Sequence, residues 1–175
     1  HEVMPQVKRL VEMGANVIPI VSENMQTTDT KFGEAARWLA MLEEMTGHRP
    51  ITSVVEAEPL GPQKVLDAIL IAPCTGNSLA RLANAITDGP VLMAAKATLR
   101  NRRPVVVAIS TNDGLGLNAL NLARLLTAKH FYFVPFGQDN PFQKQTSLVA
   151  KMELIPETLQ AALDGEQLQP MLITH

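Results

Sequence analysis

The sequence predicts an α/β fold in which a parallel β-sheet lies between two layers of helices. Segments 68–72 and 105–109 are apolar at every position, which is typical of parallel strands that are covered on both faces. Strand-like runs also alternate with helix-like runs along the chain. Apolar residues make up 46% of the 175 residues and charged residues 18%, which suits a single packed domain spanning residues 1–175.

The first part of the chain carries the weaker signals. In order, we expect a helix at 3–13, a strand at 17–21, a helix at 30–45, a weak strand at 51–55 and one helical turn at 63–66. Gly14 and Gly47 follow the two helices as stop signals, and Thr30 precedes the second helix as a cap. Folds of this class usually begin with a strand, so we expect the first strand to be missing from this chain.

In the second part of the chain, predicted strands and helices alternate more clearly. We expect strands at 68–72, 105–109 and 131–136, and helices at 78–86, 91–99, 115–126 and 156–163. Asp88, Gly89 and Pro90 separate the first two of these helices, and Gly165 follows the last one. Because parallel strands need a crossover between them, this order fits a right-handed βαβ arrangement.

Composition excludes several classes of function. The formal net charge is −2 and the tightest basic group is only Arg100, Arg102 and Arg103, whereas a nucleic-acid-binding face needs a basic stripe. No apolar run approaches the roughly 20 residues that cross a bilayer. With one cysteine and no signal peptide, we expect a cytoplasmic protein. The four histidines show no metal-ligand spacing, so no metal site is expected.

Three loops are predicted to lie beyond the carboxyl ends of strands, where open α/β sheets bind ligands. They span residues 22–28, 73–78 and 110–116. In the second loop, Gly76 would let a flat ligand approach the backbone, and Ser78 or Asn77 is expected to cap the next helix. An ordinary capped loop without a ligand is the alternative interpretation.

The third loop reads Ser-Thr-Asn-Asp-Gly from residue 110, and its alternative interpretation is a plain turn. Asn118, one turn into the next helix, is expected to reach the same cleft, whereas Asn121 is expected to face solvent. Cys74 has no histidine near it in sequence, so we expect a buried packing residue rather than a nucleophile. Neither Gly-x-Gly-x-x-Gly nor a Walker loop is present.

Residues 73–78, together with "LARLANAITD" at 79–88, resemble the Pro-Ala-Ser-Ala-Asn-Thr signature of the flavin-containing cysteine decarboxylase family. Three further stretches resemble one subunit of a two-subunit synthase in this family: "AISTNDGLGLNALNLARLL", "YFVPFGQDNPFQKQTSLVA" and "LDGEQLQP". The likeness covers nearly the whole chain, and 134–150 is its most specific part.

The resemblance implies a flavodoxin-like (Rossmann-like) sheet, bound FMN, homo-oligomers and an A-type partner subunit, with NAD(P) on that partner. The pair would oxidise a dihydrodipicolinate-level precursor, a small dicarboxylate, in the mother cell of a sporulating bacterium. The cofactor-binding residues that it implies are Ser22, Pro73, Cys74, Thr75, Gly76, Asn77, Ser78, Ser110, Thr111, Asn112 and Asp113. Asn77 and Asn112 are the candidates for catalysis, and Arg81 and Lys144 are candidate substrate cations.

The sequence also departs from the family in three places. The first strand and the glycine-serine turn that hold the flavin phosphate have no counterpart here. Glu56, Glu58 and Pro59 stand near the position of the decarboxylase histidine, and residues 110–113 replace a Pro-Ala-Met-Asn segment. Two alternatives therefore remain open: a non-redox subunit that stabilises its partner, and another flavin enzyme such as a phosphopantothenoylcysteine decarboxylase. The polar segment 137–147 is expected to form a lid or a partner contact.

Overall fold

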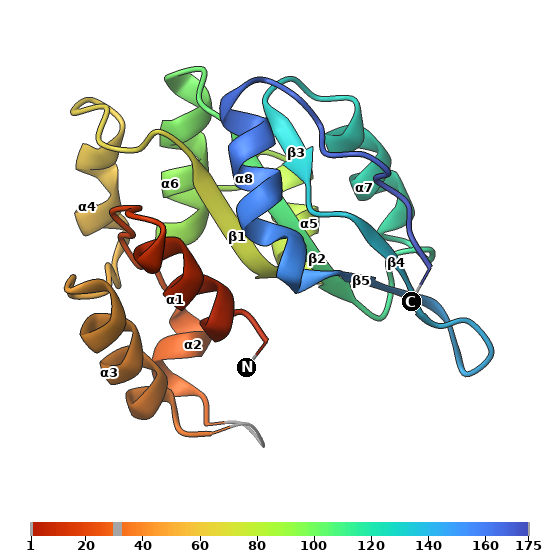
Figure 1. The fold of residues 1–175 in the computed structure, drawn as a ribbon, viewed down its shortest axis with the longest axis horizontal. Coiled ribbons are helices and arrows are strands. Elements are labelled where there is room, and N and C mark those ends of the chain that lie inside the picture. Colours follow the sequence, from red (N-terminus) through yellow and green to blue (C-terminus); the bar gives the residue numbers. More distant parts are fainter. Residues whose placement is uncertain (1, 30–32, 175) are drawn as a thin grey trace.

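The computed structural model describes residues 2–29 and 33–174. The elements are α1 (Met4–Glu12), α2 (Glu23–Thr27), α3 (Ala35–Thr46), α4 (Val54–Ala57), the 3-10 turn η1 (Glu58–Leu60), β1 (Ile69–Cys74), α5 (Gly76–Ala83), α6 (Pro90–Arg100), β2 (Val105–Thr111), α7 (Ala119–Leu126), β3 (Phe131–Phe133), β4 (Phe136–Asn140), β5 (Lys144–Ala150), the 3-10 turn η2 (Met152–Leu154) and α8 (Ile155–Leu163). Figure 1 shows the helices arranged around a central sheet.

The sheet is built around β2, which pairs with different strands at its two ends. Its first half lies between β1 and β3, and both pairings are parallel. At its other end Ser110 and Thr111 pair with β5 in the antiparallel sense, and β4 pairs with β5 as an antiparallel hairpin. The expectation of a parallel sheet is therefore correct for β1, β2 and β3 and wrong for β4 and β5, which a short turn joins.

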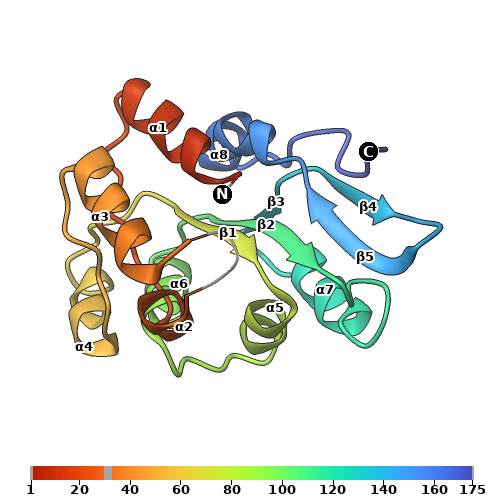
Figure 2. The ribbon, with the colours of Figure 1, turned by 90° about the horizontal axis from the view of Figure 1, so that it is seen from below.

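Helices cover both faces of the sheet, as the sequence predicted. Figure 2 shows α1 and α8 on one face and α5, α6 and α7 on the other. The α/β class with three layers is thereby confirmed. Arg9 joins α1 to α8, because its guanidinium donates to Glu157 Oε1 at 2.6 Å and to the Glu153 carbonyl at 3.2 Å.

The hydrophobic core centres on β2. All five residues from Val105 to Ile109 have no exposed surface, as the uninterrupted apolar run predicted. Leu79 of α5 and Phe133 of β3 are buried beside them in the same cluster. A smaller cluster of Val7, Val21 and Leu42 lies under α1 and α3.

Two strands predicted in the first part of the chain do not form. Residues 17–21 make only an isolated parallel bridge from Ile20 to Ile51. Pro19 lies in this segment and has no N–H to donate to a ladder. The strand predicted at 51–55 ends at that bridge, because Ser53 and Glu56 form a capping box that starts α4. Residues 63 and 64 form a turn, and residues 65 and 66 are irregular, so the predicted helical turn at 63–66 is wrong.

Several boundaries also shift. The helix predicted at 30–45 is α3, which begins at Ala35, where the Asp29 carboxylate accepts a hydrogen bond from the Ala35 amide at 2.8 Å. The predicted cap Thr30 lies outside the described residues. Gly47 does end α3, in a left-handed conformation with φ +70°. The strand predicted at 131–136 divides into β3 and β4, and Pro135, at the break, lacks a ladder donor.

Ile155 tests the packing of α8 on the sheet. Its side chain has no exposed surface, so we expect Ile155→Ala to lower the free energy of unfolding by about 2–5 kcal/mol through lost burial and a cavity. Guanidinium denaturation measures this change. Val55→Ala is the control, because Val55 is 77% exposed and should change stability by less than about 0.5 kcal/mol. Equal losses in both variants would contradict the described packing.

Candidate functional site

Two of the predicted loops meet at one edge of the sheet. Cys74 of β1 lies opposite Ile109 of β2 in the parallel register, so both strands deliver their following loops to the same edge. The loops are in contact: a Cβ added to Gly76 would lie 2.7 Å from Thr111 Oγ1 and 2.9 Å from Asn118 Nδ2. Gly76 is therefore needed for packing between the loops, which is a different reason from the close approach of a ligand predicted from the sequence.

The first loop is shorter than predicted, because α5 begins at Gly76 and not at residue 78. Thr75 is the N-cap, and its Oγ1 accepts a hydrogen bond from the Ser78 amide at 3.4 Å. The prediction that Ser78 or Asn77 caps this helix is wrong, since the chain turns into the helix two residues earlier. Pro73 is exposed next to the buried Cys74.

The start of α5 presents hydrogen-bond donors at this edge. The N–H groups of Gly76 and Asn77 have no acceptor within the helix, and in the part of the chain that the structure describes they donate to none outside it. The Asn77 side chain is exposed and has no hydrogen-bond partner among those residues. A helix start with free amides favours a polar or anionic ligand group.

The second loop is partly a strand. Ser110 and Thr111 are the last residues of β2, which corrects their assignment to a loop. Asn112 is exposed, and its amide side chain makes no hydrogen bond to the described residues. Asp113 turns back on its own loop, where its carboxylate accepts from the Leu117 amide and from Asn118 Nδ2, both at 3.0 Å. Asp113 therefore orders the second loop. Asn112 is the residue of this loop whose exposed polar side chain is available to a ligand.

A chain of amide side chains ties the second loop to α5 and α7. Asn121 donates to Asn118 Oδ1 at 2.9 Å, and Asn84 donates to Asn121 Oδ1 at 3.2 Å. Arg124 ends the chain by donating to Asn84 Oδ1 at 2.7 Å. Asn118 reaches the second loop as predicted, but as the N-cap of α7 and not one turn into the helix. The prediction of a solvent-facing Asn121 is wrong, because Asn121 is half-buried in this network. Asn84 lies in the 79–88 stretch and Arg124 in the 108–126 stretch that carry the family resemblance, but no pattern singled out either residue for the site.

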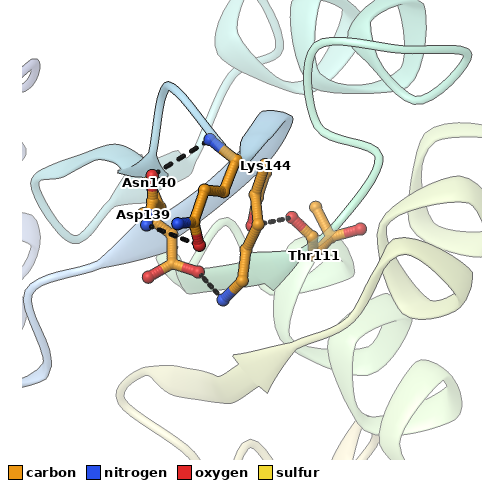
Figure 3. A network of polar contacts seen from close by, with 6 residues as sticks. Thr111, Asp139, Asn140 and Lys144 are labelled. Carbon is orange, nitrogen blue, oxygen red and sulfur yellow. Dashed lines mark hydrogen bonds and ion pairs between the residues drawn. The ribbon is translucent and has the colours of Figure 1, made fainter.

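The β4–β5 hairpin supports the second loop from the other side. Ser147 Oγ donates to the Thr111 carbonyl at 3.3 Å, and Thr146 Oγ1 donates to the Asn112 carbonyl at 2.6 Å. Figure 3 shows Thr111 beside this hairpin, where Lys144 forms an ion pair with Asp139. Segment 137–147, predicted to form a lid or a partner contact, is an ordered hairpin bonded to the second loop, and Phe142 near its tip is 91% exposed.

The remaining sequence-predicted residues lie apart or are engaged elsewhere. Ser22 is the N-cap of α2, where its Oγ accepts from the Met25 amide at 3.4 Å, and among the described residues it bonds to neither loop. Arg81 is paired with Asp88 at 3.5 Å. Glu56 accepts hydrogen bonds from the Thr52 amide and from other donors of its capping box, which lower the pKa of its carboxyl.

Cys74 is a packing residue, as predicted. Its side chain has no exposed surface, and this burial raises the pKa of the thiol to about 12. A thiol that stays protonated at neutral pH is a poor nucleophile. Across residues 2–29 and 33–174, no group of three or more histidine, cysteine or acidic side chains could hold a metal ion. None of the described helices is long and apolar enough to span a bilayer.

Comparison with known proteins defines the class of this protein. The flavoprotein family model matches residues 2–161, and the chain belongs to the flavoprotein family. The match to the B subunit of dipicolinate synthase from Bacillus subtilis (strain 168) is 57% identical over 173 residues, covering 99% of this chain and 86% of that protein.

Solved structures agree with this placement. The crystal structure of the dipicolinate synthase B subunit from Bacillus halodurans C superposes with a TM-score of 0.92 at 59% identity, covering 99% of this chain and 89% of that one. The FMN-binding protein AtHal3 has a TM-score of 0.62 at 15% identity, with 96% and 94% covered. The FMN-dependent cysteine decarboxylase SpaF has a TM-score of 0.61 at 17% identity, with 93% and 88% covered. At such identities, the last two show only a shared fold.

Gly76 tests the contact between the two loops. We expect Gly76→Ala to lower the free energy of unfolding by about 1–3 kcal/mol, because the new Cβ would collide with Thr111 and Asn118. Urea denaturation measures the loss. Gly89→Ala is a matched control at the N-cap of α6, where an added Cβ meets no atom within 4 Å. Should the Gly89 variant lose as much stability, the described contact would be wrong.

Cys74 makes stability depend on pH in the alkaline range. The native thiol ionises only near pH 12, whereas an exposed thiol in the unfolded chain ionises near about 8.5. The unfolded chain therefore releases a proton first, and this contribution to stability is lost as the pH rises above about 9. We expect the free energy of unfolding of Cys74→Ala to fall less steeply between about pH 8 and 10.5 than that of the wild type. Rapid alkylation of the native thiol would contradict the burial.

Proposed function

We propose that this chain is the flavin-binding subunit of a dipicolinate synthase and acts with an A subunit. The pair would oxidise a dihydrodipicolinate-level precursor to dipicolinate in the cytoplasm of the mother cell during sporulation. The observation that carries the proposal is the contact between the 73–78 and 110–118 loops, in a chain 57% identical to the dipicolinate synthase B subunit over 99% of its length.

The residues at this edge suit the polar rim of a flavin ring. The amide side chains of Asn77 and Asn112 have no partner within residues 2–29 and 33–174 and can both donate and accept, and the N–H groups at the start of α5 add donors. No lysine or arginine occurs in 73–78 or 110–118, so the helix start is the part of this edge that suits an anionic group. A bound flavin would supply a hydride acceptor.

The protein's own residues would hold and orient the ring and restrict water around it. Asn77 and Asn112 would bind the ring, and the Asp113–Asn118 hydrogen bond would keep the second loop in place. The β4–β5 hairpin would cover the site or meet the A subunit. Lys144 and Arg81 are both ion-paired, so either would have to leave its carboxylate to bind a dicarboxylate substrate.

A second candidate function is a subunit that stabilises its partner without redox chemistry. It is favoured by the tip of the β4–β5 hairpin, where the 91% exposed Phe142 offers an aromatic side chain of the kind that protein interfaces bury. The cysteinyl decarboxylase alternative is less well supported, because Glu56, which stands near the position of the family's histidine, is used in the capping box of α4. Homo-oligomers are expected in either case, and NAD(P) would bind the A subunit.

The experiment is to titrate FMN into the protein and follow quenching of flavin fluorescence. We expect binding by the wild type, and roughly fivefold weaker binding by Asn77→Ala or Asn112→Ala, because each loses a hydrogen bond worth about 1 kcal/mol. Gln160→Ala removes an exposed amide on α8 and serves as the control.

Dipicolinate formation is then assayed with the A subunit, the precursor and each variant. The rate should require both subunits and should fall in the two asparagine variants. Wild-type protein that binds no FMN but still accelerates the A subunit would support the stabilising role instead. If the A subunit alone reaches the same rate, both candidate functions fail.

A further inference from the structure

A hollow lies at the opposite end of the sheet from the candidate site. It has a volume of about 400 Å³ and is lined by Lys64, Arg100, Asn101, Arg102 and Arg103. Arg103 comes two residues before β2, and Lys64 comes five residues before β1. These five residues, the basic hollow, therefore surround the amino-terminal ends of the strands, whereas the candidate site follows the carboxyl ends.

The basic hollow concentrates positive charge in a protein whose net charge is −2. Four of its five residues are cations, and one carboxylate lies within 4.0 Å of them in the described residues, that of Asp67, which is 3.9 Å from Arg103. Three cations thus have no ion-pair partner among those residues. Like charges gathered in a concave surface raise the local potential and attract anions.

The ordinary explanation for basic residues here is the C-terminus of α6. Cations near a helix end offset its dipole, and Arg100 is in the last turn. The backbone already satisfies that end, however: the Arg103 amide donates to the Thr98 carbonyl at 3.1 Å, and the Arg102 amide donates to the Leu99 carbonyl at 2.9 Å. This is the Schellman pattern of capping bonds, so cationic side chains are not needed to satisfy those carbonyls.

Two of the cations occupy backbone positions that favour glycine. Arg102 has φ +57° and Lys64 has φ +51°, and both values lie in the left-handed region, where a side chain carries a cost. Arg102 also stands at the position of the Schellman pattern where glycine is most common. Ala85 and His130 share this conformation elsewhere in the chain, but of these described residues only Arg102 and Lys64 have a side chain at the strained position that lines the basic hollow.

Asn101 adds a fixed neutral group to the basic hollow. Its Nδ2 donates to the Gly61 carbonyl at 2.9 Å, which joins the turn after α6 to the segment after η1. The side-chain orientation that this bond fixes leaves the second N–H of the amide without a partner among the described residues. The hollow therefore combines long cationic side chains with one held donor.

We propose that the basic hollow binds a small phosphate-bearing polyanion. Three guanidinium groups around one hollow present several pairs of N–H donors, which match phosphate oxygens in bidentate pairs. The oxygens of a phosphate point in four directions and can meet several guanidinium groups, whereas a single carboxylate is satisfied by one. The hollow, with a volume of about 400 Å³, has room for a diphosphate, whose additional oxygens can meet more of the guanidinium groups than those of a single phosphate ion.

Inorganic pyrophosphate is the probe, titrated into the full chain by calorimetry at constant ionic strength. Arg102→Gly is the informative variant, because glycine suits the left-handed backbone at this position and the fold should be retained. We expect this variant to bind pyrophosphate at least about tenfold more weakly, as the loss of a charge-assisted contact predicts. Its thermal midpoint should equal or exceed that of the wild type.

Arg37→Gln is the matched control, since it removes one exposed positive charge from α3, far along the chain from the basic hollow. It should leave pyrophosphate affinity unchanged. The proposal is overturned if the wild type binds no pyrophosphate, if Arg37→Gln weakens binding as much as Arg102→Gly, or if citrate binds as tightly. It is also overturned if Arg102→Gly leaves pyrophosphate affinity unchanged and weakens only the binding of an acidic partner protein. FMN titration of the same variants separates this result from the proposed function, because FMN affinity should not change.

Discussion

The parallel pairing of β1 with β2 is the constraint on which the rest of this structure depends. Because Cys74 lies opposite Ile109, the loops that follow the two strands emerge at one edge, and the segments that precede them lie at the other. Each end then acquires its own character. The carboxyl edge carries polar side chains with the single carboxylate of Asp113, and helix amides that have no partner among the described residues. Four cations lie at the amino edge.

Much of the polar chemistry at the carboxyl edge is used by the protein itself. Thr75 caps α5, Asp113 and Asn118 hold the second loop, and hydroxyls of β5 bond to the carbonyls of Thr111 and Asn112. Such internal bonds keep a site preorganised, which reduces the ordering that a ligand must otherwise impose. These bonds also reduce the number of candidate ligand-binding residues to Asn77 and Asn112, whose side chains have no hydrogen-bond partner among the described residues.

The flavoprotein family supplies the scaffold, and this chain uses one part of it differently. The proteins SpaF and AtHal3 share the fold at 17% and 15% identity. Such a likeness indicates a common architecture and does not indicate a common reaction. Glu56, expected from the sequence to stand near the position of the family's histidine, accepts hydrogen bonds from the amides of Thr52 and Ser53 in the capping box of α4. A carboxylate held in this way stabilises α4 and is not positioned as a reactive group.

The sequence by itself determined the class of fold, the positions of strands β1 and β2, and the two loops that follow them. Burial on both faces, which the apolar runs predicted for both strands, holds for β2 but not for β1, where Leu70 and Ala72 are only partly buried. Continuous apolar runs and the polar turns after them are local signals. The packing role of Cys74 could be predicted because no histidine lies near it in the sequence. Tertiary structure decided the rest. The 17–21 strand is reduced to one bridge, the 137–147 segment pairs as a hairpin, and Asn84 joins Asn121 across 37 positions. These outcomes depend on hydrogen-bond partners distant in the chain, and no local pattern of residues records which partners will meet.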